Sequence, residues 1–197
     1  MYLIFDVSSI DKPKNWKAPF SDTFSWPRMI HISWIILNKD LKPMKDYDCI
    51  VRPEGFSINE TIEKRCRIQK KELDEKGESL DDVLKQFNAS LKDAQYLFAH
   101  NMNFNENVLA AEYLRQGLDH DLFKTERVCL MQESTFYCKI PSKQGGYKWP
   151  SLGELHATIF KQKYSPAGNA RADVIAAARS FIALMKVGAF EDLFDDE

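Results

Sequence analysis

Short apolar runs of strand length lie near the start of this chain, and a stripe of helical period lies near its end. The runs are "YLIFDVSSI" at 2–10 and "MIHISWIIL" at 29–37. The stripe consists of Val174, Ala177, Ala178, Phe181, Ile182 and Met185. Steps of three and one between its members are typical of one face of an amphipathic helix. Strands followed by helices in this order predict a mixed α/β fold, with helices packed on a sheet.

The segments between these ends add further strands and helices. A Pro-rich loop is predicted at 11–28, because its three prolines exclude a central strand. We expect further strands at 47–53 and 94–99, and helices at 79–91, 103–117, 128–137, 151–160 and 170–186. Asn103 and Glu106 are predicted to form a capping box at the start of the helix at 103–117, and Gly117 is predicted to end this helix.

Composition favours an ordinary globular protein. Of the 197 residues, 44% are hydrophobic and 28% charged, and the net charge of -2 gives no global attraction to nucleic acid. We expect a single domain at 1–187 and an acidic, mobile tail at 188–197. The lack of a signal peptide, of a long apolar segment and of a C-x-x-C pair favours a cytoplasmic protein with reduced thiols and no membrane association.

Two carboxylates, Asp6 and Asp173, occupy positions that would suit metal binding or catalysis. Asp6 follows a buried run without a break, and residues 6 and 8 point to the same face of a strand. Asp6 is therefore either a firmly held metal anchor or a residue that caps a turn with Ser8 or Ser9. Asp173 borders the apolar stripe and is either a functional acid or a first-turn acid that favours the helix dipole. Neither residue alone establishes catalysis.

Five segments, taken in order, resemble the motifs of the DEDD 3′-5′ exonuclease superfamily. They are "IFDVSSI", "RMIHISWIIL" with "IVRPEGFSI", "LFAHNMNFNENVL", "KWPSLGELHATIF" and "AGNARADVIAAARSF". The chain is most similar to the group around the proofreading (epsilon) subunit of DNA polymerase III and ribonuclease T. The resemblance covers about residues 1–186. It implies a ribonuclease H-like fold with a mostly five-stranded sheet and helices on both faces.

Five positions depart from the family pattern. Asp6 and Asp173 match two of the four metal-binding acids, but Ser8 and Asn105 stand where the family has Glu and Asp. Gly168 stands in place of the His that acts as general base. In a turn that contacts the substrate, Cys66 and Arg67 replace the family's His and Gly.

The resemblance implies hydrolysis by two divalent cations, Mg²⁺ or Mn²⁺, which four carboxylates hold while a His accepts the proton of the attacking water. Loss of two charges costs on the order of several kcal/mol of Coulomb energy. Loss of the base costs roughly a further 10² to 10⁴-fold in rate. We therefore expect weak metal binding at Asp6 and Asp173 and negligible hydrolysis. The alternatives are a non-enzymatic module that binds nucleic acid or a protein, and an active site relocated to Glu106, His100 or Asp11.

The resemblance also implies a partner, the 3′ end of single-stranded DNA or RNA. The contact residues that we expect are Cys66, Arg67, His100, Asn101, Lys148 and Trp149. Basic and aromatic residues occur together at 11–28, 63–71 and 139–149, a composition that suits phosphate contacts and base stacking. The other interpretation is that loops expose lysines in any protein while the aromatic residues pack on the core.

Overall fold

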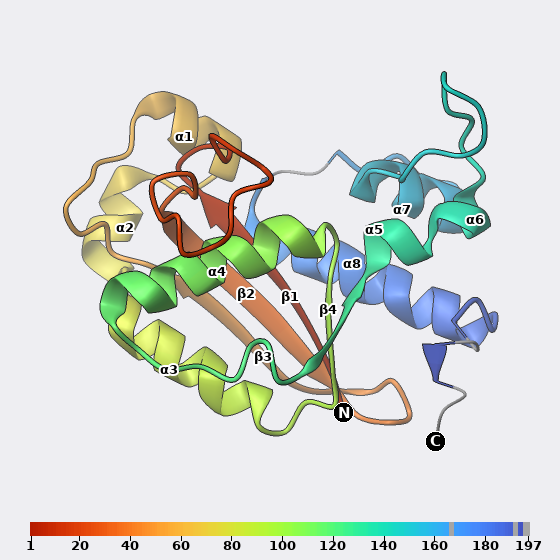
Figure 1. The fold of residues 1–197 in the computed structure, drawn as a ribbon, viewed down its shortest axis with the longest axis horizontal. Coiled ribbons are helices and arrows are strands. Elements are labelled where there is room, and N and C mark those ends of the chain that lie inside the picture. Colours follow the sequence, from red (N-terminus) through yellow and green to blue (C-terminus); the bar gives the residue numbers. More distant parts are fainter. Residues whose placement is uncertain (166–167, 191–192, 195–197) are drawn as a thin grey trace.

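A five-stranded mixed sheet forms the centre of the computed structural model, which describes residues 1–165, 168–190 and 193–194 (Figure 1). The strands are β1 (Tyr2–Ser9), β2 (Met29–Leu37), β3 (Pro43–Ile50), β4 (Tyr96–Ala99) and β5 (Glu126–Cys129). Their order across the sheet is β3-β2-β1-β4-β5. The pairs β1–β2 and β2–β3 are antiparallel, whereas β1–β4 and β4–β5 are parallel. The predicted α/β fold class is thereby confirmed.

Helices cover both faces of this sheet. They are α1 (Glu60–Cys66), α2 (Lys70–Lys76), α3 (Leu80–Leu91), α4 (Met102–Gln116), α5 (Leu130–Glu133), α6 (Thr135–Cys138), α7 (Leu152–Phe160) and α8 (Ala170–Lys186). Ser79 and Ser151, the first residues of two predicted helices, are N-caps, because each hydroxyl accepts the backbone N–H of the third helical residue. Gly117 ends α4 in the left-handed conformation, as its sequence position predicts.

The alternation of side chains along β1 separates two apolar layers. Leu3, Phe5 and Val7 pack in a cluster with residues of α3 and α4, whereas Ile4 packs in a second cluster with residues of α7 and α8. Because side chains of a strand alternate between faces, Asp6 and Ser8 lie on the same side of the sheet as Ile4. The strand therefore directs these two polar residues toward the layer that contains α8.

Several predicted boundaries differ from the observed ones. The strand predicted at 47–53 runs from Pro43 to Ile50. The helix predicted at 128–137 is the end of β5 followed by two single-turn helices. The two seven-residue helices α1 and α2 lacked a prediction because their sequences are mostly charged, and each buries at most two side chains.

The capping box predicted at Asn103 and Glu106 is wrong. The residue before α4 is Asn101, which has φ 65° and makes no side-chain capping hydrogen bond. Glu106 instead forms an ion pair with Arg127 of β5, at 3.3 Å between Oε2 and Nη1. The helix therefore begins two residues earlier than the capping pattern suggests.

The predicted acidic tail at 188–197 falls partly outside the described residues. Within it, Phe190 is buried, and Leu193 and Phe194 pack against the layer of α7 and α8. The Phe194 ring lies 4.9 Å from that of Tyr96 and 5.8 Å from that of Tyr2. These three residues are thus held on the core, and the division at residue 187 stays a prediction.

The cysteines are free thiols, and three of the four are buried. Across the described ranges, no helix combines the length and apolar character that crossing a membrane requires.

A buried carboxylate anchors the long loop at 11–28. Glu112 of α4 is fully buried, and its side chain contacts Arg28 Nε at 3.0 Å, Arg115 Nη1 at 3.1 Å and the Met29 amide at 2.7 Å. Arg115 in turn donates to the carbonyls of Thr23 and Trp26. The loop is therefore fixed to α4 by charge-assisted hydrogen bonds, which are stronger than neutral ones.

We expect Glu112→Ala to lower the free energy of unfolding by about 3 to 5 kcal/mol, because it leaves two guanidinium groups without their buried partner. Urea unfolding followed by circular dichroism measures this change. The control is Glu60→Ala, which removes an exposed helix pair with Lys64 and should change stability little. Equal effects of the two substitutions would contradict the anchoring role of Glu112.

Candidate functional site

Residues far apart in the sequence meet where the end of β1 approaches the first turns of α4 and α8. Asp6, Asn105, Gly168 and Asp173 line one hollow of about 370 Å³. Ser8, two residues beyond Asp6, lies beside it and contacts Gly168. The structure therefore brings together all the positions that the sequence resemblance singles out as catalytic.

The Asn105 side chain is occupied by hydrogen bonds within the protein. It is buried, with 1% of its surface exposed. Its Oδ1 accepts the Val7 amide at 2.8 Å, and its Nδ2 donates to the carbonyls of His100 and Asn101 at 3.0 and 3.2 Å. The amide thus fastens the start of α4 to β1, and the oxygen that could face a metal ion already accepts a backbone hydrogen.

Ser8 is likewise engaged by the backbone. Its hydroxyl donates to the Gly168 carbonyl at 2.7 Å and accepts the Ala170 amide at 2.8 Å. Only 3% of Ser8 is exposed. The residue therefore joins β1 to the N-terminus of α8, and it satisfies one of the helix amides that have no partner within the helix.

The two acids face each other in a poorly solvated place. Burial raises the pKa of Asp6 well above its ordinary value, and the neighbouring charge of Asp173 raises it further, while the Asn105 side chain opposes part of the effect. Asp173 is 7% exposed and accepts a hydrogen bond of 2.7 Å from the Tyr164 hydroxyl. Burial and this carboxylate also raise the pKa of Tyr164, so that the phenol stays a donor.

These side chains do not fit a pair of divalent cations. Mg²⁺ and Mn²⁺ prefer several oxygen ligands, with carboxylates supplying the compensating charge. Here the two neutral candidates, Ser8 and Asn105, already satisfy backbone groups. Among the described residues, no group of three or more His, Cys, Asp or Glu is arranged to hold a metal ion. The site offers two acids, Asp6 and Asp173.

No effective general base occupies the expected position. Gly168 has φ 62°, a conformation that side chains rarely adopt, and a Cβ built there would lie 3.1 Å from the Arg65 carbonyl oxygen. The nearby His100 lines the same hollow, but its Nε2 contacts the Pro150 carbonyl at 3.0 Å. Burial lowers the pKa of His100 to about 4, which makes its imidazole a weak base.

A second hollow of about 490 Å³ continues from the first. The two share Val7, Asn101, Phe104 and Gly168, and we call them together the groove. The second hollow adds Lys12, Trp16 and Arg65, among others. The Trp16 ring is 46% exposed and lies 5.9 Å from that of Phe104. The groove thus has acids at one end and cations with aromatic rings at the other.

The six residues predicted to contact nucleic acid divide into several places. His100, Asn101 and the buried Cys66 line the groove. Arg67 lines a separate hollow with residues of α1 and α2. Lys148 pairs with Glu154 at 2.6 Å, and the adjacent Trp149 is 57% exposed.

Two contacts near the site were not singled out from the sequence. Arg65 faces the groove and donates to the Ser9 carbonyl, whereas Arg67, which the resemblance selected, does not line the groove. Tyr164 reaches Asp173 from the segment before α8. The basic composition of 63–71 marks Arg65 only as one of five cations, and no sequence signal marks Tyr164, because both contacts depend on how distant segments pack.

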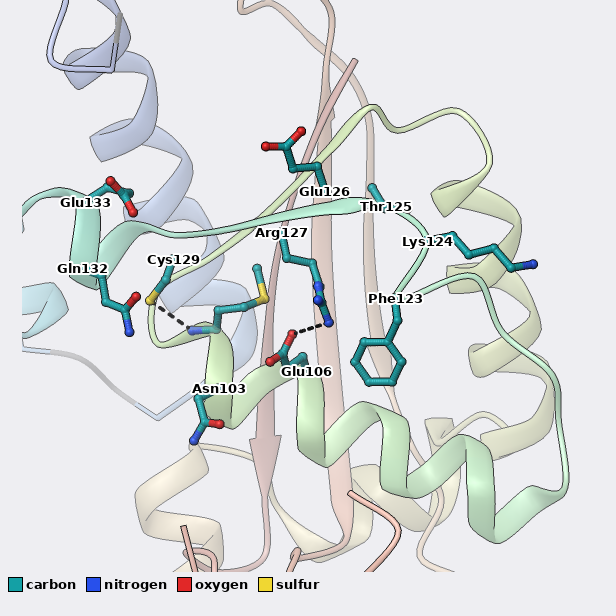
Figure 2. A pocket seen from close by; sticks show the side chains of 11 residues that line it. Asn103, Glu106, Phe123, Lys124, Thr125, Glu126, Arg127, Cys129, Gln132 and Glu133 are labelled. Carbon is teal, nitrogen blue, oxygen red and sulfur yellow. Dashed lines mark hydrogen bonds and ion pairs between the residues drawn. The ribbon is translucent and has the colours of Figure 1, made fainter. Parts of the chain in front are cut away.

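The acid Glu106 lies outside the groove. It lines another hollow, of about 600 Å³, beside β5 (Figure 2). There it points toward Arg127, and the lining mixes both charges with Asn103, Gln132 and Thr125. The described lining includes neither Asp6 nor Asp173. A relocated metal centre built on Glu106 and these acids is therefore not supported, although Asp11 does line the groove beside Lys12.

Comparison with solved structures relates this fold to exonuclease I. A zinc-bound complex of Escherichia coli exonuclease I with single-stranded DNA aligns with TM-score 0.71 and 17% identity, over 98% of this chain and 42% of that one. The E. coli enzyme with a dT13 oligonucleotide gives TM-score 0.72 at 17% identity, covering 98% and 42%. A product-bound exonuclease I gives TM-score 0.73 at 14% identity, covering 98% and 46%.

The present chain spans less than half the length of these proteins. No protein-family model matches its sequence, and no curated relative matches it either. At this level of identity the likeness shows a common fold, the exonuclease I fold.

We expect Ser8→Ala to lower the free energy of unfolding by about 1 to 3 kcal/mol, because it leaves the Gly168 carbonyl and the Ala170 amide without a partner. Thermal and urea unfolding measure the change, and Ser21→Ala at an exposed loop position is the control. A Ser8 variant as stable as the control would contradict the joining role of the hydroxyl.

We expect Asp6→Asn to raise stability at neutral pH by about 1 kcal/mol, because it removes a buried charge next to Asp173. An acid whose pKa is raised on folding favours the folded state when protonated, and this contribution is lost as pH rises from its unfolded to its folded pKa. The advantage of the variant should therefore shrink toward acidic pH. Urea midpoints measured from pH 3 to 8 test this, and a constant advantage would refute it.

Proposed function

We propose that this protein binds the 3′ end of single-stranded nucleic acid in the groove and has lost efficient phosphodiester hydrolysis. The observation that supports the loss is the engagement of Ser8 and Asn105 by backbone groups of β1, α4 and α8. At positions 8 and 105, where the resemblance expects metal-binding acids, the side chains instead connect β1 to α8 and to α4 by hydrogen bonds. The protein is thus a pseudoenzyme on an exonuclease fold.

The remaining acids favour weak binding of a single Mg²⁺ or Mn²⁺ ion over a two-ion centre. When bound, divalent cations would supply charge compensation and an activated water for hydrolysis. Asp6 and Asp173 would be the ligands, while the neutral side chains of Ser8 and Asn105 already satisfy backbone groups. Two carboxylates compensate less charge than four do, so the affinity for a cation should be low.

The chemistry of the groove supports a strand as the ligand. Lys12 and Arg65 can neutralise phosphates, and the half-exposed Trp16 offers a face for base stacking. The similar E. coli exonuclease I structures contain single-stranded DNA and a dT13 oligonucleotide. Within the groove we assign strand contacts to His100, Asn101 and Cys66, and outside it to Arg67, Lys148 and Trp149.

We also propose that 1–187 is one domain and that the protein is cytoplasmic.

Incubation of the pure protein with a 5′-labelled oligonucleotide and Mg²⁺ or Mn²⁺ tests this function. We expect no shortening of the strand beyond that seen with Asp6→Ala. We also expect fluorescence anisotropy to show binding that persists in EDTA and weakens steeply with salt, because phosphate contacts release counterions.

Two results would contradict the proposal. Metal-dependent release of nucleotides that disappears in Asp6→Ala would identify an active nuclease with unusual ligands. Failure to bind any single-stranded DNA or RNA oligonucleotide at low salt would remove the strand as ligand and favour a protein partner.

A further inference from the structure

A hairpin at 139–149 projects from the body of the protein beside α6 and α7 (Figure 1). Pro141 and Tyr147 pair across it, and the Lys148 amide donates to the Ile140 carbonyl at 2.9 Å. The Ser142 amide donates to the Gly146 carbonyl at 3.0 Å and closes the turn. The hairpin is thus a defined element with its own backbone hydrogen bonds.

Aromatic rings on and beside this hairpin face the solvent. Phe136 of α6 is 75% exposed, Trp149 57% and Tyr147 45%. The rings of Phe136 and Tyr147 lie 6.2 Å apart at nearly a right angle. Trp26 and Trp34 are buried, whereas Phe24 and Trp16 are exposed at other places on the surface. Several exposed rings in one place mark an interaction surface better than scattered apolar residues do.

The charge of this surface is positive. Residues 134–150 contain three lysines and no acidic residue. Lys148 is paired with Glu154 of α7. Lys139 and Lys143 are exposed and have no acidic partner within the described part of the chain. Phe136, Tyr147, Trp149, Lys139 and Lys143 together are called the hairpin surface below.

The hairpin surface adjoins the groove through Pro150. The Pro150 carbonyl contacts His100 Nε2, and the next two residues, Ser151 and Leu152, line the groove. Trp149 immediately precedes this contact. Residues 149–152 therefore connect the hairpin directly to the lining of the groove.

We infer that the hairpin surface binds the part of a single-stranded nucleic acid that lies upstream of its 3′ end, stacking bases on the rings and placing phosphates near Lys139 and Lys143. This inference rests on the proposed function and adds the length of strand that the protein recognises. Single strands are bound in this way, because every base has a face for stacking and every linkage carries a negative charge. An apolar peptide would leave the two lysines unused.

The test measures anisotropy or competition in EDTA with oligothymidylates of three and of twelve nucleotides. Phe136→Ala/Trp149→Ala should weaken binding of the long oligomer roughly tenfold or more and leave the short one unchanged. Lys139→Gln/Lys143→Gln should lower the slope of log affinity against log salt by about 1.4 for the long oligomer only. Lys12→Gln in the groove should weaken both oligomers.

Matched controls lie at the opposite end of the sheet. Met44→Ala removes an exposed apolar side chain that is 58% accessible, and Lys42→Gln/Lys45→Gln removes the same net charge. Both should bind the two oligomers as the unmodified protein does. Because every substituted side chain is exposed, the variants should retain the circular dichroism and melting temperature of the unmodified protein.

The outcomes separate this inference from the function on which it rests. If the short oligomer binds and the hairpin variants bind the long one with unchanged affinity, the inference is overturned while the groove keeps its ligand, and the rings are left for a protein partner. If neither oligomer binds the unmodified protein, both the proposed function and the inference fail. An equal loss for both oligomers in the hairpin variants also refutes an upstream contact.

Discussion

Hydrogen bonds from two polar side chains hold β1, α4 and α8 together at the point where the groove forms. Asn105 joins α4 to β1 through the Val7 amide, and Ser8 joins β1 to α8 through the Ala170 amide. Both side chains are almost completely buried, so a lost partner would leave a polar group unsatisfied in a dry place. The positions of Asp6 and Asp173, and the shape of the hollow between them, depend on these joints.

The distribution of charge along the groove follows from this arrangement. At one end two acids lie close together, and burial and the charge of Asp173 raise the pKa of Asp6. At the other end, Lys12 and Arg65 lie beside exposed Trp16, where phosphate and base contacts remain possible. One end of the groove therefore carries the acids, and the other carries the side chains suited to contact phosphates and bases, so binding of a strand does not require hydrolysis.

The sequence predicted the elements with strong periodicity and clear ends. The apolar runs became β1 and β2, the stripe became α8, and serine caps marked the starts of α3 and α7. The charged helices α1 and α2 and the four-residue strand β5 escaped prediction, because tertiary packing rather than local pattern determines them. At Asn103, a plausible capping pattern was outweighed by the geometry of the turn after β4.

The resemblance to the family motifs located the candidate site but did not predict which groups its side chains contact. It placed Asp6, Ser8, Asn105, Gly168 and Asp173 in one group, and the structure brings them together. It left open whether the oxygens of Ser8 and Asn105 could serve a metal, which depends on hydrogen bonds between residues up to 162 positions apart. It also chose Arg67 where Arg65 faces the groove, because Arg65 lies within α1 whereas Arg67 ends that helix in the left-handed conformation.

The contacts around Gly168 bear on whether the residues that the resemblance expects would fit this backbone. An acid at position 8 would deprive the Gly168 carbonyl and the Ala170 amide of their shared partner. A histidine at position 168 would require a left-handed backbone and would crowd the Arg65 carbonyl. An aspartate at position 105 would lose the amide that donates to the carbonyls of His100 and Asn101. Each of these substitutions made alone therefore begins with a loss of stability, so that evolution could introduce them only together with a shift of the backbone between α1 and α8.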